Sequence, residues 1–396
     1  MRSLITIVTK TYILKLKQFA VVMGMGMASI GASGAVVPAN ALTFNFAPAA
    51  GTSQLAIDGF NAAGAMWSAA LKDNVSVNIN IDFKALDPGV LGEASSSTRT
   101  FSYGQVYNAL KADRSSADDN AAVNSLSQKS TFNMLLNRTA NSPNGSGSAT
   151  PYLDNNGNAN NSNIVTTTAN AKALGLQGNG GNDASISFSN LFAWDFDRND
   201  GIGNGAFDFV GIAAHEIGHA LGFVSGVDLL DANSSNPQID RQFTDVTSLD
   251  LFRYSTDSKD KGVIDWTADK RDKYFSLDGG VTKIASFSTG VNFGDGNQAS
   301  HWQDNLALGI MTPRIAPGDL LQITENDQRA LDAIGWDRVG SGAINGQQQA
   351  LKAIASNRLV AAATSTAVPE PANYLGTLII AAIGVKIVLN RRQVRD

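Results

Sequence analysis

The sequence contains no cysteine among its 396 residues. Disulfide cross-links, zinc–thiolate sites, a cysteine nucleophile and cysteine-dependent latency are therefore all excluded. Charged residues are also scarce at 16%, whereas hydrophobic residues make up 43% of the chain. That hydrophobic share can build a sizeable core and excludes global disorder, and the length allows one large domain or two ordinary ones.

Positive charge is especially scarce in the body of the chain. Residues 1–41 carry four basic and no acidic residues, and residues 368–396 carry four basic and two acidic ones. The intervening residues 42–367 therefore hold 22 basic and 33 acidic residues, a formal net charge of −11. This balance argues against a nucleic acid or an anionic membrane as the ligand of the body.

The N-terminal segment has the pattern of an export signal. Three lysines precede an apolar run of 12 residues over 19–30, and the A-x-A sequence Ala39-Asn40-Ala41 follows it. We predict a signal peptide over 1–41 that is cleaved after Ala41. A membrane anchor is the alternative, but a permanent span needs about 20 apolar residues.

The C-terminal segment combines a Val368-Pro369-Glu370-Pro371 sequence, an apolar run over 374–389 and the pair Arg391-Arg392. This order over residues 368–396 resembles a PEP-CTERM sorting signal, after a predicted linker over 339–367. The resemblance implies an exosortase-type sorting enzyme as partner, and membrane contact only through the tail before processing. It implies export to the surface, the exopolysaccharide matrix or the surroundings of a Gram-negative bacterium. A plain transmembrane tail anchor is the alternative.

Hydrophobic periodicity predicts an α+β fold. Residues 60–71 have helical spacing of apolar side chains, and residues 74–83 and 183–190 alternate strictly, as half-buried strands do. Residues 137–182 are rich in Asn, Gly, Ser and Thr and are predicted to form surface loops around short strands. Three further segments complete the prediction: a mostly helical stretch over 98–136, a helix over 207–222 and a capped helix over 324–334.

The helix predicted over 207–222 contains the sequence H-E-x-x-H. Four residues turn a helix by about 400°, so His215 and His219 share one face and can both reach one Zn²⁺. The Glu216 carboxylate lies beside them, where it can take a proton from a zinc-bound water and pass it to a leaving amine. The flanking residues are apolar, and burying this motif is costly without a metal or other partners.

The whole chain has three histidines, and the third is His301, in the sequence S-H-W, followed ten residues later by Met311 in M-T-P. With H-E-x-x-H-x-x-G-F, these sequences resemble the metzincin metallopeptidases, specifically the leishmanolysin-like branch, over about 200–338. The resemblance implies that His301, separated from His219 by 81 intervening residues, is the third zinc ligand, and that Met311 is the Met-turn residue below the zinc.

The resemblance also implies the architecture of the catalytic domain. We expect an α+β domain over 42–338 with a twisted sheet, an active-site helix and a Met-turn, and a zinc-site core over about 183–338. Residues 183–190 are expected to be the edge strand that aligns a peptide substrate.

Other side chains are weaker candidates for metal binding. Asp228 follows the active-site helix closely and is the alternative third ligand, whereas Ser225, at the position that most metzincins use, is a poor zinc ligand. A second cluster of oxygen ligands resembles a calcium loop, but its glycine comes one place late for an EF-hand, and a solvated turn is favoured over Ca²⁺. The members of that cluster are Asp195, Asp197, Asn199 and Asp200.

The sequence therefore predicts an exported, zinc-dependent metalloendopeptidase that hydrolyses protein or peptide substrates, with Glu216 as general base. Two alternatives stay open. One is a catalytically inert surface or extracellular-matrix protein built on the same domain. The other is a zinc hydrolase that acts on a non-peptide bond.

Overall fold

The computed structural model describes residues 42–86, 90–232, 237–339 and 368–369. The predicted signal peptide and linker, and all but two residues of the sorting signal, lie outside the described residues, apart from Val339. In the described part of the chain, no helix is long and apolar enough to cross a membrane. The described elements form a mixed α+β fold, in agreement with the predicted fold class.

The helices are α1 (Gln54–Ala70), α2 (Tyr103–Asp113), α3 (Ala117–Ser125), α4 (Thr168–Ala173), α5 (Phe209–Ala220), α6 (Val227–Ala232), α7 (Thr256–Lys259) and α8 (Glu325–Ala333), with 3-10 turns η1 (Ala159–Asn161), η2 (Asp240–Gln242) and η3 (Leu249–Phe252). The first strands are β1 (Thr43–Pro48), β2 (Ser76–Lys84), β3 (Gly92–Ser96), β4 (Thr98–Ser102), β5 (Met134–Leu136), β6 (Tyr152–Asp154), β7 (Asn163–Thr167) and β8 (Ala184–Ser189). The later ones are β9 (Trp194–Asp195), β10 (Phe207–Asp208), β11 (Arg253–Tyr254), β12 (Ile264–Asp265), β13 (Lys273–Phe275), β14 (Ala285–Phe287), β15 (Arg314–Ile315) and β16 (Val368–Pro369).

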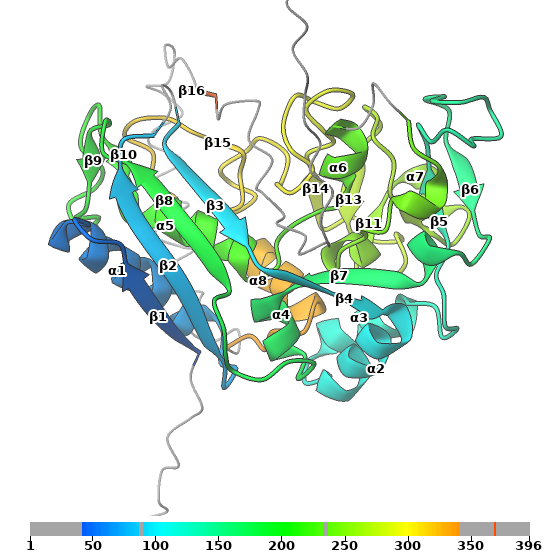
Figure 1. Cartoon of the computed structure of the whole chain (residues 1–396), viewed down its shortest axis with the longest axis horizontal. Coiled ribbons are helices and arrows are strands. Elements are labelled where there is room, and N and C mark those ends of the chain that lie inside the picture. Colours follow the sequence, from blue (N-terminus) through cyan, green and yellow to red (C-terminus); the bar gives the residue numbers. More distant parts are fainter. Residues whose placement is uncertain (1–41, 87–89, 233–236, 340–367, 370–396) are drawn as a thin grey trace, which may run out of the picture. The chain divides into compact units, whose positions relative to one another are not determined.

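The largest sheet has the strand order β1-β2-β8-β3 (Figure 1). Strands β1, β2 and β8 run parallel, and β3 pairs antiparallel with β8, so that Ala94 lies opposite Ile186. The strands predicted over 74–83 and 183–190 are confirmed as β2 and β8. The prediction that 183–190 is the edge strand is wrong, because β8 has a neighbour on each side. The edge is β3, whose Gly-Glu-Ala-Ser-Ser sequence lacks the apolar alternation that reveals strands.

Helices α1 and α5 pack together on one face of this sheet. The Trp67 indole of α1 donates a 2.8 Å hydrogen bond to the carbonyl of Ala214 in α5. Rings from α1, β8 and α5 meet in a triangle, with centroids 5.0–5.4 Å apart for Phe60, Phe188 and Phe209. Aromatic contacts of this kind add to the burial energy, and they hold α5 firmly against the sheet.

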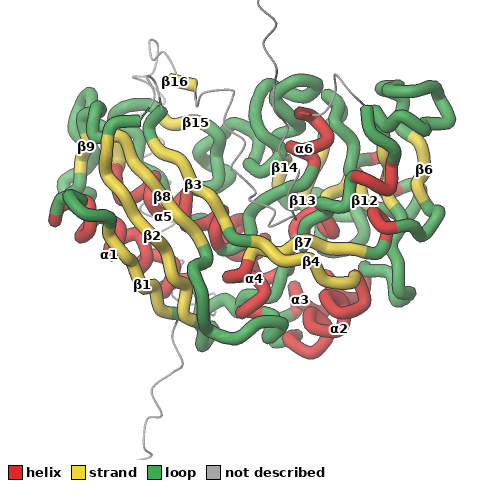
Figure 2. The backbone as a smooth tube through the Cα atoms, viewed as in Figure 1, coloured by secondary structure: helices red, strands yellow, loops and turns green. Residues whose placement is uncertain are grey.

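Shorter sheets and long loops make up much of the remaining chain, as Figure 2 shows. Residues 137–182 were expected to form surface loops around short strands. Short strands are present as β6 and β7, but the expectation is wrong for residues 168–173, which form the largely buried helix α4. Their polar side chains are satisfied internally: the Lys172 ammonium lies 2.5 Å from the Asp183 carboxylate, and the Asn170 amide donates to the Ile334 carbonyl. Composition alone misled because these polar groups find partners inside the protein.

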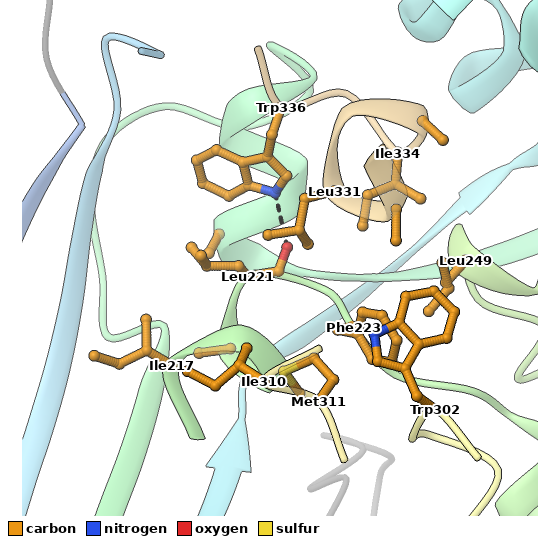
Figure 3. Close-up of a cluster of buried hydrophobic side chains, with 14 of the residues drawn as sticks. Ile217, Leu221, Phe223, Leu249, Trp302, Ile310, Met311, Leu331, Ile334 and Trp336 are labelled. Carbon is orange, nitrogen blue, oxygen red and sulfur yellow. Dashed lines mark hydrogen bonds between the residues drawn. The ribbon is translucent and has the colours of Figure 1, made fainter. Parts of the chain in front are cut away.

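The predicted helix over 324–334 is confirmed as α8. At its start the Asp327 carboxylate accepts the Thr324 N–H at 2.7 Å, and the helix ends before Gly335, whose φ is +102°. Just beyond α8, the Trp336 indole donates a 2.8 Å hydrogen bond to the Leu221 carbonyl (Figure 3). This bond holds the segment after α8 against the end of α5.

Candidate metal centre

Helix α5 carries the H-E-x-x-H sequence, and a buried carboxylate fixes where the helix begins. The Asp208 side chain caps α5 by accepting the Gly211 N–H at 2.8 Å, and it also accepts the Leu321 N–H at 3.0 Å. Burial raises the pKa of Asp208, and the Arg198 guanidinium, 3.1 Å away, opposes this rise. The helix ends before Gly222, whose φ of +116° lets the chain turn away sharply.

The structure brings the three histidines together, although His301 lies far from α5 in the sequence. The Nε2 atoms of His215 and His219 are 3.1 Å apart, and those of His215 and His301 are 3.3 Å apart. His215 and His301 are buried, and His219 is partly exposed, so solvent reaches the cluster beside His219. Among the described residues, this is the group of His, Asp and Glu side chains that could hold a metal ion.

Backbone carbonyls determine how two of these rings present their nitrogens. His215 Nδ1 lies 2.8 Å from the Ile310 carbonyl, and His219 Nδ1 lies 2.7 Å from the Phe223 carbonyl. Because a carbonyl oxygen only accepts, each Nδ1 must be the donor, and each neutral ring then carries a lone pair at Nε2. The two Nε2 atoms lie 3.1 Å apart with no proton between them, an arrangement that favours a cation bound to both.

Burial also keeps the histidines neutral. It lowers the pKa of His215 to about 4 and, with the neighbouring His215, the pKa of His219 to about 3. The pKa of His301 is lowered well below its usual value, chiefly by burial and then by the other two rings, while the backbone of Gln298 acts in the opposite direction. Neutral imidazole is the form in which histidine binds metals.

The donor set fits zinc in chemistry and in spacing. Three imidazoles with room for one more ligand are a common catalytic zinc arrangement. A tetrahedral ion with Zn–N bonds of about 2.0–2.1 Å places its ligand nitrogens roughly 3.3–3.4 Å apart. The two separations that involve His215, 3.1 and 3.3 Å, lie close to that value, and the ligand atoms of all three histidines lie within 4.8 Å of one another.

The remaining residues of the predicted site lie around this cluster. Glu216 is 8% exposed on α5, next to His215 in the sequence, and it is not part of the ligand group. Met311 packs against α5 at Gly218, where an added Cβ would lie 2.4 Å from the Met311 sulfur. Figure 3 shows Met311 beside Ile310 in the apolar layer of the core. The closeness of Met311 and α5 explains why a glycine stands between the two α5 histidines.

The alternative ligand Asp228, and Ser225 at the position that most metzincins use, both lie outside the histidine cluster. Asp228 is not part of the histidine cluster. It accepts hydrogen bonds from the segment before His301, and burial raises its pKa to about 6. The Ser225 hydroxyl donates to the Asp250 carboxylate at 2.6 Å. The structure therefore places neither oxygen with the three histidines.

The candidate calcium loop uses its carboxylates to fold its own turn. Asp195 accepts the N–H groups of Asp197 and Gly203 at 3.0 and 2.8 Å, and Asp197 accepts the N–H of Asn199 at 3.0 Å. Neither this loop nor its member Asp200 belongs to a metal-binding group among the described residues. These bonds are typical of Asx turns, which the sequence already favoured.

Sequence reasoning missed the groups that orient the histidines. The groups are the backbone carbonyls of Ile310 and Phe223, and the type of side chain at these positions gives no sign of this role. No protein-family model, curated protein or solved structure matches the chain. Its function is therefore inferred from the geometry of the cluster.

Proposed function

We propose that the chain is a zinc-dependent metalloendopeptidase with a metzincin-like catalytic domain, and that its zinc ligands are His215, His219 and His301. The observation that carries the proposal is that His215 Nε2 lies 3.1 Å from His219 Nε2 and 3.3 Å from His301 Nε2, and that the ligand atoms of all three histidines lie within 4.8 Å of one another. The Nε2 atoms of His215 and His219 are both unprotonated acceptors, because both Nδ1 atoms are bonded to carbonyls, and at 3.1 Å they repel each other. A divalent cation that accepts nitrogen ligands resolves that repulsion, and zinc suits the set.

The proposed chemistry divides between the metal and one carboxylate. Zinc, when bound, supplies Lewis acidity toward a water molecule and the scissile carbonyl. Glu216 takes the proton from the attacking water and delivers it to the leaving nitrogen. Glu216 is buried on α5, directly after His215 in the sequence.

The sheet offers a place for an extended substrate. Strand β3 is the outer strand next to β8, and no described strand pairs with its other side. It lies close to α5 in the fold (Figure 1). A peptide that added to β3 would bond through its main chain and run past the histidines, which suits an endopeptidase.

Zinc content and proteolysis of the purified exported protein test this proposal together. We expect about one zinc per chain, casein hydrolysis that stops with a chelator, and recovery when zinc is restored. A protein that binds zinc but cleaves neither casein nor a peptide library would support the inert matrix protein. A protein that binds no zinc would refute the proposed site altogether.

We also propose that the protein is exported and that its sorting tail is removed by an exosortase-type enzyme. The support is the order of Pro-Glu-Pro, apolar run and arginine pair over residues 368–396. Intact-mass measurement of the protein from its native host tests this proposal. A mature chain that ends near Pro371 is expected, and a tail still attached to most molecules would indicate a permanent anchor.

A further inference from the structure

His301 returns to the cluster after 81 intervening residues, so its place cannot come from local helix geometry. The segment that leads into it, residues 298–300, belongs to no helix or strand. A segment of this kind needs specific bonds to hold a ligand in position, because irregular backbone has no ladder of its own. The question is which groups supply those bonds.

The Asp228 carboxylate on α6 accepts several hydrogen bonds from this segment. Asp228 accepts the Ala299 N–H at 2.6 Å and the Ser300 N–H at 3.2 Å. It also accepts the Ser300 hydroxyl at 2.5 Å, and that hydroxyl in turn accepts the Ser225 N–H at 2.9 Å. The two residues before His301 are thus fixed to the chain that has just left α5.

A buried cation holds the other side of the same segment. The Arg253 guanidinium donates to the Ala299 carbonyl at 3.4 Å and to the Ser288 carbonyl at 2.7 Å. Ser288 also holds the two residues that follow this segment. Its N–H donates to the His301 carbonyl, and its hydroxyl donates to the Trp302 carbonyl. Ala299 is therefore held at its N–H by Asp228 and at its carbonyl by Arg253.

We infer that Asp228 is a positioning residue that holds His301 in place for metal binding, and that it is not itself a ligand. This inference rests on the proposed zinc site. The Asp228 carboxylate contacts the backbone immediately before His301, while the metal-binding group contains the three histidines and excludes it. Its role resembles that of the outer groups around metal sites, whose loss typically lowers metal affinity about 10–100-fold.

The same helix supplies a matched control. Asp231, three residues further along α6, also accepts two consecutive N–H groups, those of Asn292 and Phe293, at 2.7 and 2.9 Å. It is the more buried of the two aspartates, and its partners lie in a loop that does not contain a histidine. If burial and hydrogen bonding alone mattered, replacing Asp231 would do at least as much damage as replacing Asp228.

The experiment compares Asp228→Asn and Asp231→Asn in the full exported protein. The zinc dissociation constant is measured by competition with a chelator, and the visible spectrum of the Co²⁺-substituted protein reports the ligand geometry. Urea unfolding of the metal-free forms measures stability separately. We expect Asp228→Asn to weaken zinc binding about 10–100-fold and to alter the Co²⁺ spectrum, while Asp231→Asn stays within about threefold of the unmodified protein.

Each other outcome decides against the inference. Equal loss of affinity in both variants would reduce Asp228 to a structural role, and unchanged affinity in Asp228→Asn would remove it from the site. Complete loss of zinc in Asp228→Asn, together with retention in His301→Ala, would make Asp228 a ligand. If the unmodified protein binds no zinc, the proposed function fails first, and this result is distinguishable from the others.

Discussion

The candidate site joins two regions that reach the same point by different means. In α5, His215 and His219 lie one turn apart, and the helix itself aligns them. In the segment around His301, the alignment comes from side chains on other elements, above all Asp228, Arg253 and Ser288. The comparison shows that a helix places adjacent ligands and one carbonyl orients each ring, whereas a distant ligand needs a surrounding set of hydrogen bonds to place its backbone.

The largest effect should come from removing one ligand from each region. His219→Ala and His301→Ala should each reduce zinc from about one per chain to almost none, because two imidazoles are too few for a stable site. Metal analysis of the dialysed proteins measures this loss. Retention of stoichiometric zinc by His301→Ala would reject His301 as the third ligand and would make Asp228, on α6, the leading alternative.

The next effect separates chemistry from metal binding within α5. Glu216→Gln should keep zinc and the fold but lower casein hydrolysis about 10²–10⁴-fold, since the amide cannot take a proton from water. Glu325→Gln, at an exposed carboxylate that starts α8, provides the control and should keep full activity. Turnover by Glu216→Gln comparable to that of the control would exclude Glu216 from the mechanism.

A smaller effect should appear where the two regions touch, at Gly218 and Met311. Gly218→Ala places a Cβ 2.4 Å from the Met311 sulfur and should cost about 1–3 kcal/mol of the free energy of unfolding. Gly104→Ala is the helical control, because nothing lies within 4 Å of its added Cβ, and it should be neutral or stabilising by up to about 1 kcal/mol. Urea titration measures both, and equal stability of the two variants would contradict the close packing of Met311 on α5.

The smallest effect should be the change in pH-dependent stability caused by Asp113, a partly buried carboxylate close to other carboxylates. Burial, with Asp337 and Asp73 nearby, raises the pKa of Asp113 to about 7. A carboxyl group with a raised folded-state pKa binds more protons in the folded protein, so stability falls as pH rises from about 4 to 7. Asp113→Asn should weaken this fall and stabilise the protein at pH 8.

Unfolding midpoints at pH 5 and pH 8 test this expectation. Asp260→Asn, at an exposed position after α7, changes the net charge equally and serves as the control. If Asp113→Asn, Asp260→Asn and the unmodified protein show the same pH dependence, the pKa of Asp113 is not raised in the folded protein.

Local patterns predicted the parts of the fold that depend on local physics. Alternation identified β2 and β8, helical spacing identified α1, and Thr324 with Asp327 identified the start of α8. The start of α1 was placed six residues late, because Gln54 and the small residues after it show no apolar stripe. Periodicity therefore found these elements, while their boundaries depended on caps and packing.

Features that depend on distant contacts could not be predicted from the sequence. Strand β3 exists because β8 offers it a partner, and β7 and α4 are buried because pairs such as Lys172 and Asp183 satisfy each other. The three histidines were identified by their rarity, and the structure brings them together. Asp228 was considered only as a ligand, since its actual partners are backbone groups 71 and 72 residues away.

The 81 residues that lie between His219 and His301 have a consequence for folding. An isolated α5 offers two imidazoles, and the third arrives only after a long loop has closed and its hydrogen bonds have formed. We therefore expect an emerging or unfolded chain to capture zinc weakly and the complete fold to capture it tightly. If the proposed protease is exported as we propose, its activity would appear only after this loop has closed.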